Sequence, residues 1–93
     1  MDHYIISKFH TVPDAALISE ITSLFQGALD VPGVVGVRVK SNVTPRPNRY
    51  DLMIVITLEN PEALNAWDRC EIHKQWKAHY GEMLEKKAIF DCD

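Results

Sequence analysis

Hydrophobic positions along the chain change between a two-residue and a three-to-four-residue spacing, which predicts alternating strands and helices. Residues 3–9 form a short, β-rich run that Pro13 and Asp14 end, so we expect a strand there. Asp14 is a suitable N-cap for a following helix with one apolar face. That face consists of Leu17, Ile18, Ile21, Leu24, Phe25 and Ala28.

Two further strands are expected after the turn at Pro32-Gly33. Valines at alternate positions predict a half-buried strand over residues 34–42. The Pro-rich stretch 44–49 is too short to link domains and is interpreted as a loop. The β-branched and aliphatic content of residues 50–59 then predicts a third strand.

The last third of the chain predicts helix and then strand. Asn60 caps the helix and Pro61 occupies its first turn, where a missing N–H costs nothing. A continuation or a second helix is expected from about Ile72, Lys86-Lys87 close it, and residues 88–92 predict the last strand. The apolar residues of this helical region are Leu64, Trp67, Trp76, Tyr80, Met83 and Leu84.

This order of elements predicts a single α+β domain over residues 1–93, with a ferredoxin-like antiparallel sheet and both helices on one face. The third strand is apolar at both parities, whereas a sheet with one wet face should alternate. Leu52, Ile54, Ile56 and Leu58 fill one parity, and Met53 and Val55 occupy the other. Since the helices cover only one face, we expect a second copy to cover the other in a homodimer.

Composition and charge disfavour some classes of function. The chain has 93 residues, 46% of them hydrophobic, and a net charge of −3, which suits one folded domain and disfavours nucleic-acid and anionic-membrane partners. The longest aliphatic run, residues 52–56, is far below the roughly 18 residues of a membrane span. Residues 4–6 are too short an apolar stretch for a secretory signal, so we expect a cytoplasmic protein with Cys70 and Cys92 reduced.

Few polar groups have a spacing that indicates chemistry. Cys70 and His73 lie three residues apart, which suits one metal ion or a thiol beside a base, but no second ligand pair completes a zinc site. We therefore expect helix-packing side chains, with no metal and no cofactor. His73 is the titratable group of most interest, because Trp67 and Trp76 would line an apolar pocket beside it. On spacing alone the alternative, a histidine on the helix surface or satisfied in the core, is favoured.

Basic residues gather in the second strand and the following loop. Arg38, Lys40, Arg46 and Arg49 could meet an anionic ligand, and the alternative, a solvated strand face, is favoured. The third strand lacks the stacking aromatics of RNA-recognition domains, so we do not expect RNA binding.

A set of segments in this order resembles the Dabb family, the stress-responsive α/β-barrel proteins, over nearly the whole chain. The segments are residues 3–9, 31–34, 42 with 50–52, 60–64, 70–73 and 89–91. The resemblance implies a ferredoxin-like fold whose sheets pair into a dimeric α/β barrel. Most members have no assigned activity, and one plant member is a polyketide cyclase that closes its product by intramolecular aldol condensation.

The resemblance also implies site residues. The catalytic histidine of that cyclase corresponds to His73, and the histidine in the first strand of its pocket corresponds to His3. Its catalytic tyrosine corresponds to Trp67, which has no hydroxyl to share a proton, and Cys70 stands where a family histidine is common. The remaining pocket positions correspond to Ile5, Phe25, Val37 and Trp76.

Two classes of function follow. In the first, the protein is a small homodimeric module without chemistry, with a small hydrophobic ligand as its candidate partner. In the second, it is a small-molecule enzyme of the polyketide-cyclase or cofactor-free oxygenase type, and His73 is its general base.

Overall fold

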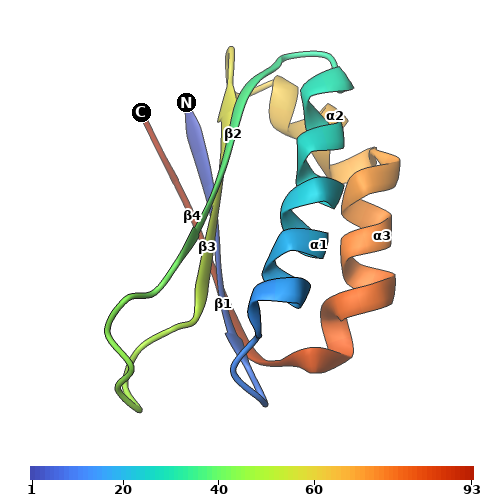
Figure 1. The fold of residues 1–93 in the computed structure, drawn as a ribbon. Helices are drawn as coiled ribbons and strands as arrows, with labels where there is room; N and C mark the ends of the chain where they lie inside the picture. The colour runs from blue at the N-terminus through green and yellow to red at the C-terminus, as the bar shows by residue number, and fades with distance from the viewer.

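A four-stranded antiparallel sheet forms one layer of the protein and the helices form the other (Figure 1). The computed structural model describes residues 1–93, and its strand order across the sheet is β2-β3-β1-β4. The strands are β1 (Asp2–Phe9), β2 (Val34–Ser41), β3 (Leu52–Leu58) and β4 (Leu84–Cys92). The predicted α+β class with an antiparallel sheet is confirmed.

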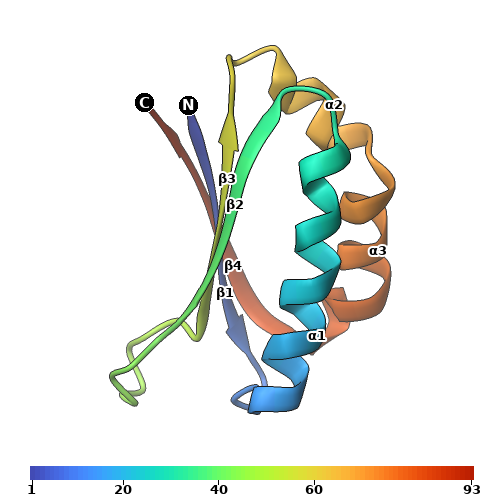
Figure 2. The ribbon, with the colours of Figure 1, turned by 45° about the horizontal axis from the view of Figure 1, so that its top comes forward.

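All three α-helices pack on one face of the sheet, and the other face carries none (Figure 2). They are α1 (Ala15–Gln26), α2 (Ala63–Arg69) and α3 (Glu71–Tyr80), with 3-10 turns at Gly27–Asp30 and Gly81–Met83. Asp14 caps α1 as predicted, because its Oδ1 accepts a hydrogen bond of 2.8 Å from the Leu17 N–H. None of the helices has the length and hydrophobicity needed to cross a bilayer.

The core lies between the sheet and the helices. In β1 the inward side chains are buried and the alternate ones are half-buried, the pattern of a central strand with one covered face. In β3 the inward Leu52, Ile54, Ile56 and Leu58 are each 1% exposed or less. Val55 points to the other face and is also only 1% exposed, since Tyr4 and Arg38 flank it in the register. The predicted two-sided apolar character of this strand is confirmed.

The predicted boundary between the last helix and the last strand is wrong. Residues 83–87 do not continue α3: the helix ends at Tyr80, and β4 begins at Leu84 and pairs with β1 along its length. β4 is an edge strand, so Glu85, Lys86 and Lys87 are exposed and the apolar alternation that signals a strand is missing. Lysines on an edge strand also discourage pairing with other chains.

The predicted start of α2 is two residues early. The first helical residue is Ala63, and Asn60 caps the preceding turn, where its Oδ1 accepts a hydrogen bond of 3.0 Å from the Ala63 N–H. Cys70 then breaks the helical region with extended backbone angles (φ −75°, ψ 159°). Of the two predicted possibilities, a continuation or a second helix, the structure has the second.

Candidate functional site

Most of the predicted pocket residues lie together in the core. Ile5, Phe25, Trp67 and Trp76 are each 2% exposed or less, and Val37 is half-buried on the inward face of β2. The Phe25 ring lies 5.8 Å from the Trp67 ring and 5.2 Å from the Trp76 ring, measured between centroids. These aromatic side chains fill the space between the sheet and the helices.

His73 lies in the first turn of α3, beside this aromatic cluster. Its ring centroid is 5.2 Å from that of Trp67, and its Nδ1 lies 3.0 Å from the carbonyl oxygen of Asp68. A carbonyl oxygen only accepts, so Nδ1 carries the proton and Nε2 presents the lone pair. The ring is therefore held in the tautomer that a general base acting through Nε2 requires.

Trp67 brings an unpaired donor to the same place. The residue is fully buried, and its indole Nε1–H has no hydrogen-bond acceptor in the protein. A buried donor without a partner costs about 1–3 kcal/mol, which makes it an exception in a folded chain. An indole N–H can donate to a ligand oxygen, but it cannot pass on a proton as a tyrosine hydroxyl can.

His3, the second predicted histidine, belongs to the sheet rather than to the helical layer. It is 6% exposed, and its Nδ1 lies 2.5 Å from the Asp91 Oδ1 on the neighbouring strand β4. The carboxylate accepts this hydrogen bond from the Nδ1–H. No sequence pattern points to a role for Asp91, because only the register of β1 with β4 brings it opposite His3.

The Cys70 side chain forms a hydrogen bond with the backbone of His73 rather than with its ring. The Cys70 Sγ accepts a hydrogen bond of 3.4 Å from the His73 N–H and so caps α3. No group of three or more His, Cys, Asp or Glu side chains comes together in a way that could hold a metal ion. Cys70 and Cys92 are free thiols on different elements.

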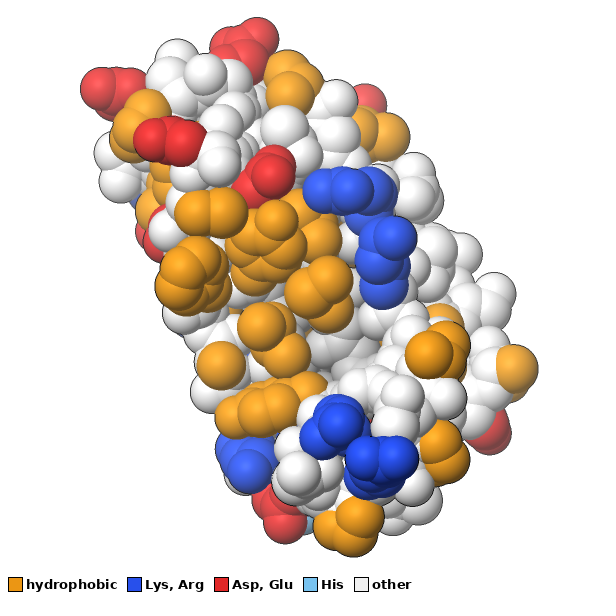
Figure 3. Space-filling view, turned by 90° about the vertical axis from the view of Figure 1, so that its left-hand side faces the viewer, with side chains coloured by type: hydrophobic (Ala, Val, Ile, Leu, Met, Phe, Trp, Pro, Cys, Tyr) orange, Lys and Arg blue, Asp and Glu red, His pale blue; other side chains and the backbone are white.

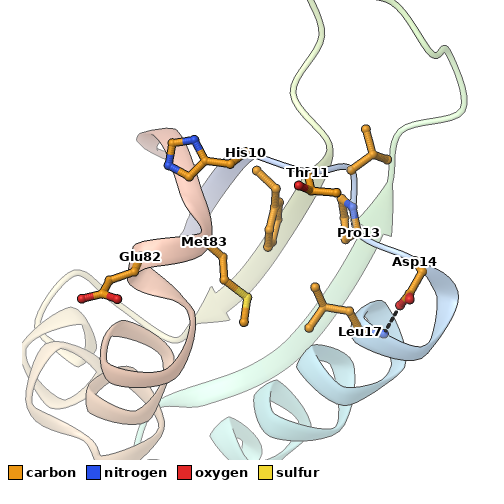
Figure 4. A pocket seen from close by; sticks show the side chains of 9 residues that line it. His10, Thr11, Pro13, Asp14, Leu17, Glu82 and Met83 are labelled. Atoms are coloured by element: carbon orange, nitrogen blue, oxygen red, sulfur yellow. Dashed lines mark hydrogen bonds between the residues drawn. The ribbon is translucent and has the colours of Figure 1, made fainter.

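The four surface cavities lie elsewhere. None is lined by His3, His73 or the five predicted pocket residues. One, of about 330 Å³, lies between the β1–α1 turn and residues 82–83, with His10 and Glu82 at its rim and Leu17 and Met83 inside (Figure 4). His10 and Glu82 lie 72 positions apart in the chain, and no sequence motif links them.

The outer face of the sheet carries the main apolar surface (Figure 3). We call it the outer patch, and its residues are Tyr4, Ile6, Met53, Ala88 and Phe90, together with the buried Val55 on the same face of the sheet. Phe90 is 61% exposed, and its ring meets that of Tyr4 edge-on at 6.5 Å between centroids. Arg38 and Lys40 of β2 flank the patch in the same rows of the register.

Comparison with known structures identifies the fold. A dimeric ferredoxin-like protein of unknown function from Thermobifida fusca matches with a TM-score of 0.80 at 12% identity, over 96% of this chain and 85% of that one. The chain has a ferredoxin-like fold. No family model and no curated protein matches the sequence.

Two other ferredoxin-like structures carry a family name or an activity. A Dabb family protein from Mesorhizobium loti matches with a TM-score of 0.76 at 12% identity, over 99% of this chain and 93% of that one. The hydroxynitrile lyase of Passiflora edulis matches with a TM-score of 0.74 at 12% identity, over 96% and 87% of the two chains. At such identities the ferredoxin-like fold is the property that these proteins share with this chain.

Proposed function

We propose that this chain is a Dabb-type domain that works as a homodimer, with two sheets packed through their outer patches into a dimeric α/β barrel. The exposure of Phe90 beside Tyr4 on an apolar sheet face carries this proposal. Large exposed apolar patches mark interaction sites on soluble proteins. The Thermobifida fusca neighbour of this fold is described as dimeric, which supports the same arrangement here.

A twofold pairing also suits the size and charge of the chain. A domain of 93 residues buries a limited share of its surface, so a second apolar layer adds stability that its core lacks. In a twofold interface the same patch serves both copies, and each row of the outer patch ends in a cation on β2.

The free thiols of Cys70 and Cys92 suit a reducing cytoplasm, which we propose as the location.

The dimer is tested by molar mass from light scattering at micromolar concentration. We expect twice the 10.6 kDa of one chain, and a single-chain mass for Phe90→Asp. Val12→Asp is the matched control, because Val12 is 75% exposed and lies outside the outer patch. A folded wild-type protein of single-chain mass contradicts the proposal, and so does an unchanged mass for Phe90→Asp.

The second candidate function is proton abstraction from a small hydrophobic carbonyl compound, with His73 as general base. Two adjacent groups favour it: the Nε2 lone pair of His73 and the unpaired Nε1–H of Trp67, which could polarise a carbonyl oxygen. Since Trp67 and Trp76 fill the space beside His73, a substrate enters only when these side chains move. His3, fixed by Asp91, is the alternative base.

Deuterium exchange into acetophenone in D₂O tests this function, followed as the loss of the methyl signal in proton NMR. We expect exchange above the buffer rate for the wild type and a return to the buffer rate for His73→Asn. The asparagine amide nitrogen takes the place of Nδ1 and keeps a donor for the Asp68 carbonyl, and circular dichroism checks that the variant is folded. Equal rates for the wild type and buffer remove the enzymatic candidate and leave the homodimeric module.

A further inference from the structure

The largest cavity, of about 420 Å³, lies between the β2–β3 loop and the β1–α1 turn. It opens at the end of the sheet opposite the chain termini (Figure 1), where Lys and Arg side chains gather (Figure 3). Its lining includes three basic side chains, Lys8, Arg46 and Arg49, and one acidic side chain, Asp51. The cavity is therefore cationic in a chain whose net charge is −3.

Hydrogen bonds hold the wall of this cavity in place. The Asp51 Oδ2 accepts a hydrogen bond of 2.8 Å from the Phe9 N–H, so one of the two carboxylate oxygens is occupied by the backbone. Lys8 Nζ donates to the Arg49 carbonyl oxygen at 3.2 Å, which ties β1 to the loop. The Asn42 amide donates to the Tyr50 carbonyl oxygen at 2.8 Å. The loop is thus braced at both ends.

We propose that this cavity binds a small organic anion with a carboxylate or phosphate head. Arg46 and Arg49 present planar guanidinium groups, which suit both kinds of oxyanion, and the Lys8 ammonium adds a third positive charge. Val12, Pro13 and Ile18 from the β1–α1 region form an apolar wall that an aliphatic or aromatic body would contact. The site uses neither the outer patch nor His73, so it is independent of the proposed function.

The volume and charge set the class of ligand. Small-molecule pockets are commonly about 300–1,000 Å³, so this cavity lies at the small end of the range. Each charge-assisted hydrogen bond is worth about tenfold or more in an equilibrium constant. An exposed cationic site also weakens with salt, because the ions screen its charges.

The test is titration of the ¹⁵N-labelled full chain with phenyl phosphate, benzoate, inorganic phosphate and benzyl alcohol, followed by amide chemical shifts. We expect the two aromatic anions to shift signals of residues 8–13 and 41–51, and the tighter of them assigns the head group. Benzyl alcohol, which lacks the charge, should cause no such shifts. Inorganic phosphate, which lacks the apolar body, should bind at least tenfold more weakly.

Two variants locate the binding. Arg46→Ala should weaken binding of the tighter anion by about tenfold, whereas Arg69→Ala, an exposed arginine on α2, should leave it unchanged. Shifts outside the cavity lining, equal shifts with benzyl alcohol, or equal affinities for the two variants overturn the proposal. If Arg46→Ala fails to fold, the shift map of the wild type decides the question by itself.

Discussion

The Cys70 thiol accepts a hydrogen bond from the backbone N–H of His73 across the first turn of α3. Cys70 has extended backbone angles (φ −75°, ψ 159°), so it ends α2 and is the N-cap residue of α3. The His73 ring lies in the first turn after this break, 5.2 Å from the Trp67 ring between centroids. A pair that resembles half of a metal site in the sequence is a helix cap in the structure.

Replacement of Cys70 tests the cap. Cys70→Ala removes the acceptor and should lower the free energy of unfolding by about 0.5 kcal/mol, the low end of the cost of a lost N-cap, because a thiol is a weak acceptor. Cys70→Ser keeps an acceptor of better cap preference and should be at least as stable as the wild type. Urea denaturation followed by tryptophan fluorescence measures both, and an alanine variant as stable as the serine variant contradicts the cap.

Gly33 should tolerate no side chain. Its φ is +88°, and a Cβ there would lie 2.5 Å from the Ala63 Cβ. The left-handed backbone alone costs an alanine about 1–2 kcal/mol, and the contact with Ala63 adds to this. Gly33→Ala should therefore lower the thermal midpoint clearly.

Gly81→Ala is the matched control for this substitution. Gly81 has right-handed helical angles and no atom within 4 Å of an added Cβ, so the change should be neutral or slightly stabilising. Equal thermal midpoints for the two variants would contradict the strain that a side chain at Gly33 should cause.

Tyr80 links the stability of the helical layer to alkaline pH. Burial, followed by the hydrogen bond to Glu20 and the charge of that carboxylate, raises the pKa of Tyr80 to about 12. The raised pKa means that the folded state keeps a proton which the unfolded state loses near pH 10, the ordinary tyrosine value. The contribution is complete below about pH 10 and is lost as the pH rises to about 12.

Tyr80→Phe removes this titration. The free energy of unfolding of the wild type should fall more steeply than that of the variant between about pH 10 and pH 12. Glu20→Gln keeps an acceptor without the charge, so its slope should lie between the two. Urea denaturation across this range measures the slopes, and parallel curves for the wild type and Tyr80→Phe would refute the link.

The element order was predictable because burial on one face produces the apolar spacing in α1 and β2, and β3 is a short β-branched and aliphatic run between turn residues. The end of α3 was not, because Met83 and Leu84 continue a helical spacing and β4 is an exposed edge strand without alternation. Gly81 was the available signal, since glycine commonly follows a helix. An edge strand such as β4 is therefore recognised by its charged residues and its place in the sheet, and not by a hydrophobic pattern.

Hydrophobic spacing predicts only part of the candidate site. Helix periodicity places Phe25, Trp67 and Trp76 on the apolar faces of their helices, and the packing of the three helices brings the rings together. Neither the His3–Asp91 pair nor the cationic cavity follows from spacing, because each joins residues from distant parts of the chain. Such sites depend on sheet register and loop closure, which no local pattern encodes.

Isotope-filtered NOE spectroscopy can detect directly whether two copies pack through their outer patches. A mixed sample of ¹³C-labelled and unlabelled chains reports only contacts between copies. We expect cross-peaks between the Met53 methyl group of one copy and outer-patch aromatic protons, Tyr4 or Phe90, of the other. Contacts confined to the helical layer, or no contact between copies at all, would contradict the account.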